Sequence, residues 1–298
     1  MIYKNPGPNS RDFFLQQQLK QQITTKMKVA IQGSHASFHE EAAFKYFGDE
    51  ITIVECESFK KTCELLKKKE VDYTVMAIEN SLAGSILPNY NLLRDYRFNI
   101  AGEVHLNIQL HLMALPDVPF EDIKFVESHP IAIRQCDDFL EDNPQLKVSE
   151  GMDTASCAQK IKAEGLRDTA AIANKLAAKV YGLEILERRI ETNKKNYTRF
   201  LILSNNREPV EGANKASLSF QIGNTVGALF SVLKCFEEEG INMSKIQSMP
   251  VLGRRNEYEF YVDVEWKNQA DYDAAIKKVL KHATNFNIMG EYLKNEKI

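Results

Sequence analysis

Between Met27 and about Ser204, short apolar segments alternate with amphipathic ones, and this alternation constrains the fold more than any other feature. The expected order begins with strand Lys28–Gln32, helix Glu40–Phe47, strand Ile51–Val54, helix Phe59–Lys69 and strand Tyr73–Ile78. Strands separated by helices join through crossovers, which gives a mostly parallel sheet with helices on its faces. The predicted fold class is therefore α/β.

A second lobe is expected after Gly102, where the long apolar and β-prone run Val104–Leu115 is the best candidate for a crossover. The final strand, Thr198–Leu203, then brings the chain back to the first lobe. Two lobes joined by two crossings enclose a cleft, and clefts between lobes bind small ligands. The second lobe is expected to contain strand Lys124–Val126, helix Ile131–Leu140, helix Thr154–Ala163 and strand Ala170–Ala173.

A polar break at 205–214 is the best linker candidate, because it contains Pro209 and Gly212 between two periodic segments. The pattern after it is βαββαβ, the ferredoxin-like arrangement. Its elements are expected at Ala216–Ile222, Val226–Glu239, Ser244–Met249, Tyr258–Glu265, Tyr272–Leu280 and Asn285–Glu291. The expected domains are a leader at 1–26, a two-lobed unit at 27–208 with lobe 1 at about 27–103 and 195–208 and lobe 2 at about 104–194, and a C-terminal domain at 214–298.

The leader, residues 1–26, is polar and is expected to be disordered and to contribute nothing to the fold. The residues leave open whether Met27 is the natural start. They also leave open whether the helix-like stretch Phe13–Gln22 packs at a subunit boundary.

Composition excludes several classes of protein. The 298 residues include 38 basic and 41 acidic side chains, a balance that argues against nucleic acid as the main partner. Five cysteines lie far apart without a CxxC pair, so neither a disulfide framework nor a zinc site is expected. No apolar run approaches the ~20 residues that a membrane helix needs, and the N-terminus lacks the apolar core of a signal peptide. We therefore expect a cytoplasmic protein without membrane contact.

Two polar clusters follow predicted strands in the first lobe. The first, Ser34–His39, enters a helix, where hydroxyls and free N–H groups suit an anionic ligand. Taken alone, an ordinary helix cap is the better interpretation of that segment. The second, Ile78–Ser85, places an acid, an amide and a hydroxyl at the end of an apolar strand, and because a cap rarely needs all three, this adds some support for binding.

The third cluster, Asn196–Phe200, places Arg199 at the start of an apolar strand. A buried arginine needs an anionic partner, and its planar fork matches a carboxylate. The partner is either a ligand or an internal glutamate, and the residues alone make the two about equally probable.

These clusters resemble the motifs of the prephenate dehydratase family. Asn196-Tyr197-Thr198-Arg199-Phe200 is similar to the family signature Asn-x-Thr-Arg-Phe. Ile78-Glu79-Asn80-Ser81 with Gly84 is similar to its Pro-Ile-Glu-Asn-Ser-x-x-Gly block, with Ala77 in place of the proline. Further blocks follow in the family's order, at Gly102-Glu103, His105, His111, Ser128-His129-Pro130, Asp153-Thr154-Ala155, Ala170–Ala173 and Tyr181–Leu183. Several ordered blocks are a far stronger signal than any single one.

The resemblance covers about Lys28 to Tyr292, and its C-terminal part is similar to an ACT regulatory domain. It implies a two-lobed, periplasmic-binding-protein-like catalytic domain followed by a ferredoxin-like βαββαβ ACT domain. Two blocks depart from the family pattern. The opening block keeps only the hydroxyl–aromatic pair Ser37-Phe38, and the family's Glu-Ser-Arg-Pro block is here Gln247-Ser248-Met249-Pro250.

The resemblance implies the conversion of prephenate to phenylpyruvate, with loss of CO2 and water, as a step in phenylalanine biosynthesis. Aromatisation drives this reaction, so no cofactor and no metal are expected. Thr198 takes over the family's catalytic role, as a hydrogen-bond donor to the leaving oxygen. Arg199, if it faces the cleft, is expected to bind the pyruvyl carboxylate of the substrate, because clamping the departing carboxylate would stabilise the ground state.

The remaining predicted substrate contacts have simpler roles. Neutral donors are expected from Asn80, Ser81 and Ser37, and ring contacts from Phe200 and Phe38, although aromatics beside a strand are more often plain core. Glu79 is expected to orient Arg199 or a backbone amide, and His129 to face the cleft. His105 and His111 lie in an apolar strand and are expected to be structural.

Regulation is also implied, since ACT domains bind an amino acid between paired domains. The resemblance therefore implies a homodimer or homotetramer with L-phenylalanine as effector, bound by Asn224, Gly227, Ala228, Leu229 and Ser248. Three rival interpretations remain open. An arogenate dehydratase would use nearly the same residues, while a solute-binding protein or a catalytically silent amino-acid sensor would bind without turnover.

Overall fold

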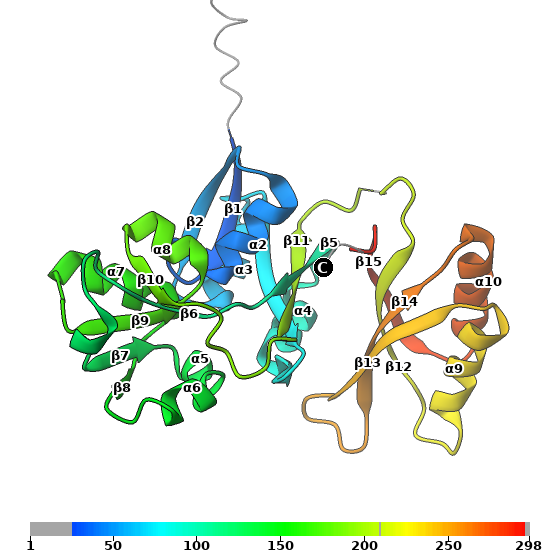
Figure 1. Ribbon diagram of the computed structural model, residues 1–298. Coiled ribbons are helices and arrows are strands. Elements are labelled where there is room, and N and C mark those ends of the chain that lie inside the picture. Colours follow the sequence, from blue (N-terminus) through cyan, green and yellow to red (C-terminus); the bar gives the residue numbers. More distant parts are fainter. Residues whose placement is uncertain (1–25, 209, 296–298) are drawn as a thin grey trace, which may run out of the picture.

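The computed structural model describes residues 26–208 and 210–295 as two α/β lobes followed by a smaller C-terminal domain (Figure 1). The leader predicted at 1–26 lies outside the described residues, apart from Lys26. The first lobe has one sheet in the order β2-β1-β3-β11-β5, and the short β4 pairs with β3. Its elements are β1 Met27–Gln32, α2 Phe38–Phe47, β2 Ile51–Cys56, α3 Phe59–Lys67, β3 Tyr73–Asn80, β4 Gly84–Ser85, α4 Leu87–Tyr96, β5 Asn99–Asn107 and β11 Tyr197–Ser204.

The second lobe has a five-stranded sheet in the order β10-β6-β9-β7-β8. Its central strand, β9, is buried along its whole length, and alanines in β9 and α7 allow the helix to pack closely on the sheet. Its elements are β6 His111–Ala114, a 3-10 turn Phe120–Asp122, β7 Phe125–Ser128, α5 Pro130–Arg134, α6 Asp137–Glu141, β8 Lys147–Glu150, α7 Thr154–Glu164, β9 Thr169–Ala173, α8 Lys175–Tyr181 and β10 Glu184–Glu187. The α/β class and the two-lobed architecture are confirmed.

The crossover between the lobes lies within the predicted run Val104–Leu115, but the first lobe continues to Asn107, a few residues beyond the expected limit near 103. The apolar run Val104–Leu115 is two strands in different sheets, since β5 ends at Asn107 and β6 begins at His111. The two crossing segments are tied together by hydrogen bonds from the N–H of Ile108 to the carbonyl of Asn196 at 2.7 Å and from the N–H of Leu110 to Glu191 at 2.9 Å. Both strands are buried, so the sequence stays apolar from one sheet to the next. Hydrophobicity alone therefore could not locate the boundary between β5 and β6.

The helix predicted over Ile131–Leu140 is two short helices, α5 and α6, with a break at Gln135 and Cys136. The carbonyl of Gln135 accepts a hydrogen bond from the N–H of Thr192 in the returning crossing segment. Cys136 is fully buried. A contact with a distant segment therefore ends the first helix. The sequence interpretation also omitted β4, α4, β8, α8 and β10.

The C-terminal domain has the predicted βαββαβ order, with an antiparallel sheet arranged β13-β14-β12-β15. Its elements are β12 Lys215–Gln221, α9 Ala228–Glu238, β13 Asn242–Pro250, β14 Tyr258–Glu265, α10 Gln269–Val279 and β15 Thr284–Tyr292. Alternate residues of β12 and β14 pack under α9 and α10 and form a separate apolar core. The ferredoxin-like prediction is thus confirmed at the level of topology.

The other face of this sheet packs on the first lobe, so that strands β5 and β11 lie on the side opposite α9 and α10 (Figure 1). The approach is closest at Gly290, where a Cβ atom would overlap the backbone carbonyl of Ile100. Only glycine permits this contact between β15 and β5. The apolar residues that join the two domains include Tyr90, Leu93, Ile100, Leu201, Met249, Tyr261 and Met289.

Candidate active site

A cavity of about 260 Å³ opens between the two lobes. Its walls come from β3, β11 and α2 of the first lobe and from the segments that begin α5 and α7 of the second. Its polar and aromatic lining residues are Gln32, Ser37, Phe38, His39, Asn80, His129, Gln135, Asp153, Thr154, Thr198 and Phe200. The structure therefore brings together six of the predicted substrate-site residues: Ser37, Phe38, Asn80, His129, Thr198 and Phe200.

Thr198 and Phe200 reach the cavity from β11. They are two residues apart on one strand and so share a face of the sheet. Both are buried, and β11 is hydrogen-bonded to β3 on one side and to β5 on the other. A paired central strand holds its side chains more rigidly than a loop does. The sheet therefore fixes the position of the Thr198 hydroxyl.

Asn80 reaches the same cavity because β3 contains a β-bulge. Phe200 of β11 lies opposite Ala77, whereas Arg199 lies opposite Glu79. One extra residue of β3 therefore stands between the two pairs, and the strand's side chains change face there. Ala77 and Asn80, three positions apart, consequently both line the cavity. In a regular strand Asn80 would face away from Ala77.

The side-chain amide of Asn80 has a single orientation. Its oxygen accepts hydrogen bonds from the N–H groups of Leu82 at 3.0 Å and Ala83 at 2.9 Å, and N–H groups only donate. The amide nitrogen therefore points the other way and donates to Oδ1 of Asn196 at 2.7 Å and to Oγ1 of Thr198 at 3.0 Å. Because the oxygen of Thr198 accepts from Asn80, its own proton is directed elsewhere and is available to a ligand.

Helix α2 begins at the cavity, and its N-cap is Ser37. His39, in the first turn, was not among the predicted site residues, although it belongs to the polar cluster Ser34–His39. Its ring stands edge-on to Phe200, with ring centres 5.1 Å apart. Burial lowers the pKa of His39 to about 4, against a smaller opposing effect of Asp153, so the imidazole is neutral at neutral pH.

His129 lines the cavity from the second lobe. It is the N-cap of α5, where Nδ1 accepts a hydrogen bond from the N–H of Ile131 at 3.2 Å. The neutral ring therefore carries its proton on Nε2. Burial lowers the pKa of His129, partly opposed by Asp153, which favours this neutral form.

The loop before α2 ties the two lobes together beside the cavity. The hydroxyl of Ser34 donates to Asp153 at 2.8 Å, and the Tyr181 hydroxyl donates to the carbonyl of His35 at 2.8 Å. The next residue of this loop, Ala36, has a left-handed φ of 66° and is fully buried among apolar residues of the second lobe. The loop of one lobe is thus part of the core of the other.

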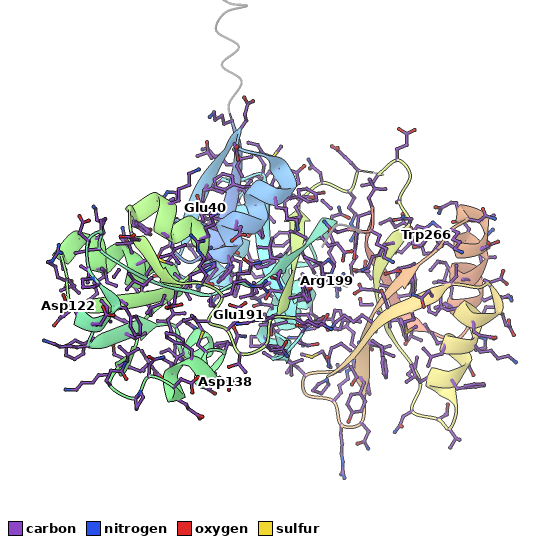
Figure 2. The ribbon with its side chains drawn as sticks, in the orientation of Figure 1. Glu40, Asp122, Asp138, Glu191, Arg199 and Trp266 are labelled. Carbon is purple, nitrogen blue, oxygen red and sulfur yellow. The ribbon has the colours of Figure 1, made fainter. Side chains whose placement is uncertain are left out.

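The structure corrects the prediction for Arg199, whose side chain points away from the cavity. It lies on the reverse face of β11, between the first lobe and the C-terminal sheet (Figure 2), where it pairs with Glu103 and Asp263. The physical reason is strand alternation: since Thr198 faces the cavity, its neighbour faces the opposite side. Of the two alternatives left open by the sequence, the internal ion pair is the one observed.

Two further predicted substrate contacts are wrong for related reasons. Glu79 is turned to the reverse face by the bulge in β3 and pairs there with Lys245 of the C-terminal domain at 2.8 Å. Ser81 is engaged in the backbone of the neighbouring segment, since its hydroxyl donates to the carbonyl of Lys195 at 3.2 Å and accepts from the N–H of Tyr197 at 2.9 Å. Neither residue lines the cavity.

Of the two histidines that the sequence assigned to structure, His111 is buried and its Nδ1 accepts a hydrogen bond from the N–H of Arg189 at 3.1 Å. His105 lies on β5 outside the cavity. Within the described parts of the chain, no group of three histidine, cysteine, aspartate or glutamate side chains is placed to hold a metal ion. No helix among these residues has the length and apolar character needed to cross a membrane.

A second cavity, of about 270 Å³, lies at the start of α9 in the C-terminal domain. Four predicted effector residues line it: Asn224, Gly227, Ala228 and Leu229. Gly227 has a left-handed φ of 81° at the N-cap of the helix, a conformation that favours glycine. Ser248 does not line this cavity, because it lies on the edge strand β13, two strands away from β12.

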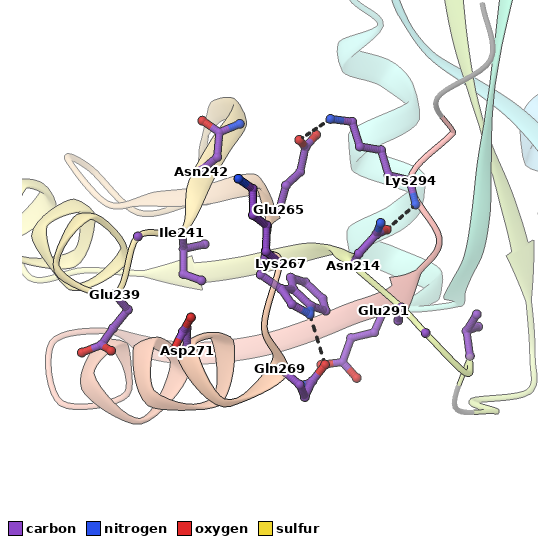
Figure 3. Close-up of a pocket in the computed structure, with 15 residues that line it drawn as sticks. Asn214, Glu239, Ile241, Asn242, Glu265, Lys267, Gln269, Asp271, Glu291 and Lys294 are labelled. Atoms are coloured by element: carbon purple, nitrogen blue, oxygen red, sulfur yellow. Dashed lines mark hydrogen bonds and ion pairs between the residues drawn. The ribbon is translucent and has the colours of Figure 1, made fainter.

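A larger cavity, of about 1200 Å³, lies elsewhere in the C-terminal domain, beside the linker (Figure 3). Some of its polar side chains are bonded to one another. Lys294 contacts Glu265 at 2.7 Å, and Nε1 of Trp266 donates to Gln269 at 3.1 Å. It brings together none of the residues that the sequence motifs singled out, so its size does not make it the candidate site.

Residues 29–208 match the family model described as prephenate dehydratase. Among curated proteins, the chain is 38% identical over 288 residues to "Arogenate dehydratase/prephenate dehydratase 1, chloroplastic" of Arabidopsis thaliana, which covers 90% of this chain and 72% of that protein.

Two solved structures share the fold over most of the chain. One is a prephenate dehydratase from Arthrobacter aurescens described in complex with L-Phe, with a TM-score of 0.79 at 24% identity, covering 90% of each chain. The other is described as GqqA, a novel type of quorum-quenching acylase, with a TM-score of 0.82 at 27% identity, covering 90% of this chain and 98% of that one.

Proposed function

Since this chain belongs to the prephenate dehydratase family, a family of enzymes, we propose that the cavity around Thr198 is its active site and converts prephenate to phenylpyruvate. The observation that carries the proposal is the Thr198 hydroxyl, held at the cavity by Asn80 with its proton free to donate.

The reaction breaks two bonds of the substrate. The ring C–OH bond breaks so that the oxygen leaves, and the bond to the ring carboxylate breaks so that CO2 leaves and its electron pair completes the aromatic ring. The departing hydroxide takes up one proton from the solvent to become water. A threonine hydroxyl is too weak an acid to transfer its proton unaided, so Thr198 acts by stabilising the charge that develops on the leaving oxygen.

Substrate carboxylates need partners other than Arg199. Among the described residues, Asp153 is the one charged side chain that lines the cavity, and it caps α7 and accepts from Ser34. Helices α2 and α7 both begin at the cavity, and their N-termini favour an anion. We propose that the pyruvyl carboxylate binds there. A ring carboxylate placed against apolar walls with no fixed cation loses its charge more easily, which favours its departure.

Turnover of prephenate tests the proposal. Purified protein incubated with prephenate should produce phenylpyruvate, followed by its absorbance, with a larger kcat/KM than for arogenate, whose product is phenylalanine. A larger value for arogenate would transfer the assignment to the related dehydratase. If neither substrate gives product, the enzyme assignment is wrong, and a solute-binding protein or an amino-acid sensor would be the remaining interpretations.

An acylase reaction, as described for GqqA, receives no support from the described cavity. Amide hydrolysis needs a nucleophile next to a base. The partner of the Thr198 hydroxyl is the amide of Asn80, which is not a base, and Nε2 of the buried His39 has no hydrogen-bond partner.

We propose that the C-terminal domain is a regulatory ACT domain that binds L-phenylalanine in the cavity at the start of α9. The supporting observation is that a small-residue turn, Gly227-Ala228, lines the cavity together with the rings of Phe230, Tyr258 and Phe260. L-phenylalanine appears in the description of one structure of the same fold. The carboxylate and ammonium groups of L-phenylalanine match backbone donors and acceptors, and its ring matches the apolar side chains that line the cavity.

A homodimer, or a homotetramer built from it, would complete this site. Strand β13 lies at the edge of its sheet. Two apolar side chains of this domain are exposed, Ile246 of β13 at 46% and Phe230 of α9 at 67%. Pairing of β13 with a second copy would cover this edge and would bring Ser248 of that copy toward the cavity. Light scattering of the purified protein at micromolar concentration measures the state directly, and a monomer would contradict the proposal.

Replacement of Gly227 by alanine should weaken L-phenylalanine binding about tenfold. The left-handed φ of 81° is unfavourable for alanine, so the turn that offers its backbone groups must shift. The measurement is the rise in melting temperature caused by L-phenylalanine. Gly240→Ala is the matched control, because Gly240 has a φ of 65° at the other end of α9 and lies outside the cavity. Equal losses of ligand effect in both variants would argue against the site.

The cytoplasmic location expected from the sequence stays a prediction, since the plant relative is named as chloroplastic. We propose it for this chain on the sequence pattern alone.

A further inference from the structure

Three strands of the C-terminal sheet converge on one side chain of the first lobe, Arg199. Its guanidinium donates to Asp263 of β14 and, at 3.0 Å, to the hydroxyl of Tyr292 on β15. Ser217 of β12 bridges these two acceptors. The third nitrogen, Nε, donates to Glu103 on β5 of the first lobe at 2.7 Å. One arginine on β11 is thereby held by both domains.

The charges in this cluster are buried and balanced. Arg199 and Lys215 face Glu103 and Asp263, and each of the four side chains is less than a tenth exposed. Burial alone would raise the pKa of the Asp263 carboxyl, but the Arg199 guanidinium outweighs this and holds it below its usual value. Buried charges tolerate few arrangements, because each displacement leaves one of them unpaired.

Elsewhere in the interface the directional contacts lie away from β11, where Lys245 of β13 pairs with Glu79 of β3 at 2.8 Å and donates to Ser85 of β4 at 3.0 Å. Around the cluster the contact consists of apolar side chains such as Leu201, Met249 and Met289. Apolar contacts stabilise docking in proportion to buried area but are not directional. The ion cluster therefore determines how β11 is aligned against the C-terminal sheet, and β11 carries Thr198 directly before Arg199.

We propose that Arg199 is a positioning residue, through which Asp263 of the C-terminal domain holds β11 and hence the Thr198 hydroxyl in the geometry that the reaction needs. Thr198 faces the cavity, and the next residue of the strand, Arg199, is held in the ion cluster. A small shift of Arg199 along the strand therefore moves the Thr198 hydroxyl relative to the leaving oxygen. Displacements of about 1 Å at a reacting group can lower turnover by about 100-fold. The inference rests on the proposed role of Thr198.

The first test compares two variants of neighbouring residues on β14. Asp263→Asn keeps the shape but removes the charge that holds Arg199, whereas Val264→Ala loosens the core under α9 and α10 without touching the cluster. We expect Asp263→Asn to lower kcat about tenfold or more with KM nearly unchanged. Val264→Ala should lower the melting temperature yet leave kcat within about twofold. Equal kcat values in the two variants would overturn the proposal.

A double-mutant cycle tests whether Arg199 acts through Asp263. Arg199→Lys keeps the charge but loses the planar fork. In the wild-type background it should lower kcat, whereas in the Asp263→Asn background it should add little. Fold-changes that simply multiply would show independent effects and exclude the proposed connection. If Asp263→Asn does not fold, Tyr292→Phe removes only one acceptor of the guanidinium and should still lower kcat about threefold, while an unchanged kcat would count against the proposal.

Hydrogen exchange separates this inference from the proposed reaction. Amide exchange of 197–204 should be faster in Asp263→Asn than in Val264→Ala, because the strand has lost its anchor. This readout does not depend on turnover. A wild-type protein that converts neither substrate would refute the proposed function, whereas unchanged exchange in β11 would refute the role of Asp263 by itself.

Discussion

Thr198→Ala is expected to lower kcat at least about 100-fold with little change in KM. The hydroxyl lies at the cavity and its oxygen accepts a hydrogen bond from Asn80, so its proton is the one directed at the ligand. The charge on the leaving oxygen develops only as the C–O bond breaks, which is why the loss falls on kcat rather than on binding. Product absorbance under saturating substrate measures it.

Thr198→Ser is the matched control, because serine retains the hydroxyl and the possible bond from Asn80. It should keep kcat within about tenfold of wild type, the difference arising from the lost methyl group that restricts rotation about χ1. Circular dichroism spectra should be the same for both variants. Turnover by Thr198→Ala at the wild-type rate would remove Thr198 from the reaction and would leave the cavity as a binding site.

Glu103→Gln is expected to lower the free energy of unfolding by about 3–5 kcal/mol. Glu103 is fully buried on β5 and accepts from Arg199 at 2.7 Å and from Lys215 at 3.0 Å. Glutamine is neutral, so Arg199 would keep Asp263 as its one carboxylate partner, and Lys215 would keep only the more distant Glu265 at 3.5 Å. Urea unfolding, followed by the fluorescence of Trp266, the only tryptophan in the chain, measures the change in the C-terminal domain.

The control for Glu103 is Glu257→Gln, which breaks an exposed ion pair with Arg254. Exposed pairs contribute about 0–1 kcal/mol, because water solvates the separated charges almost as well. A similar small loss for Glu103→Gln would mean that water enters the cluster when the charge is removed. In that case the ion pairs would not determine how the two domains are aligned.

Local patterns predicted the order of the elements well. The period-two strands and period-3.6 helices of the first lobe lie within a few residues of the expected ranges, and the βαββαβ order of the C-terminal domain agrees throughout. These features depend on neighbours within one element. Apart from the omitted elements, the errors occurred where distant segments meet, as at the end of the first lobe near Ile108 and at the break between α5 and α6, where the N–H of Thr192 donates to the carbonyl of Gln135.

Strand alternation contained an unused signal for Arg199. Consecutive residues of a strand face opposite sides, so Thr198 and Arg199 could not both face the cleft without a bulge between them. For Glu79 no such signal existed. Its direction is reversed by a bulge in β3 that is visible only in the pairing with β11, a strand more than 100 residues later.

By itself, the sequence determined the α/β alternation of the first lobe, the βαββαβ order of the C-terminal domain, and that β11 and the end of β3 carry the polar groups of the cavity. These properties follow from local periodicity and residue chemistry. Only the tertiary structure decided which side chains face a substrate. That choice depends on register shifts between strands and on the C-terminal sheet, whose Asp263 and Tyr292 surround Arg199 on the reverse face. Such contacts join residues far apart in the chain, and no local pattern records them.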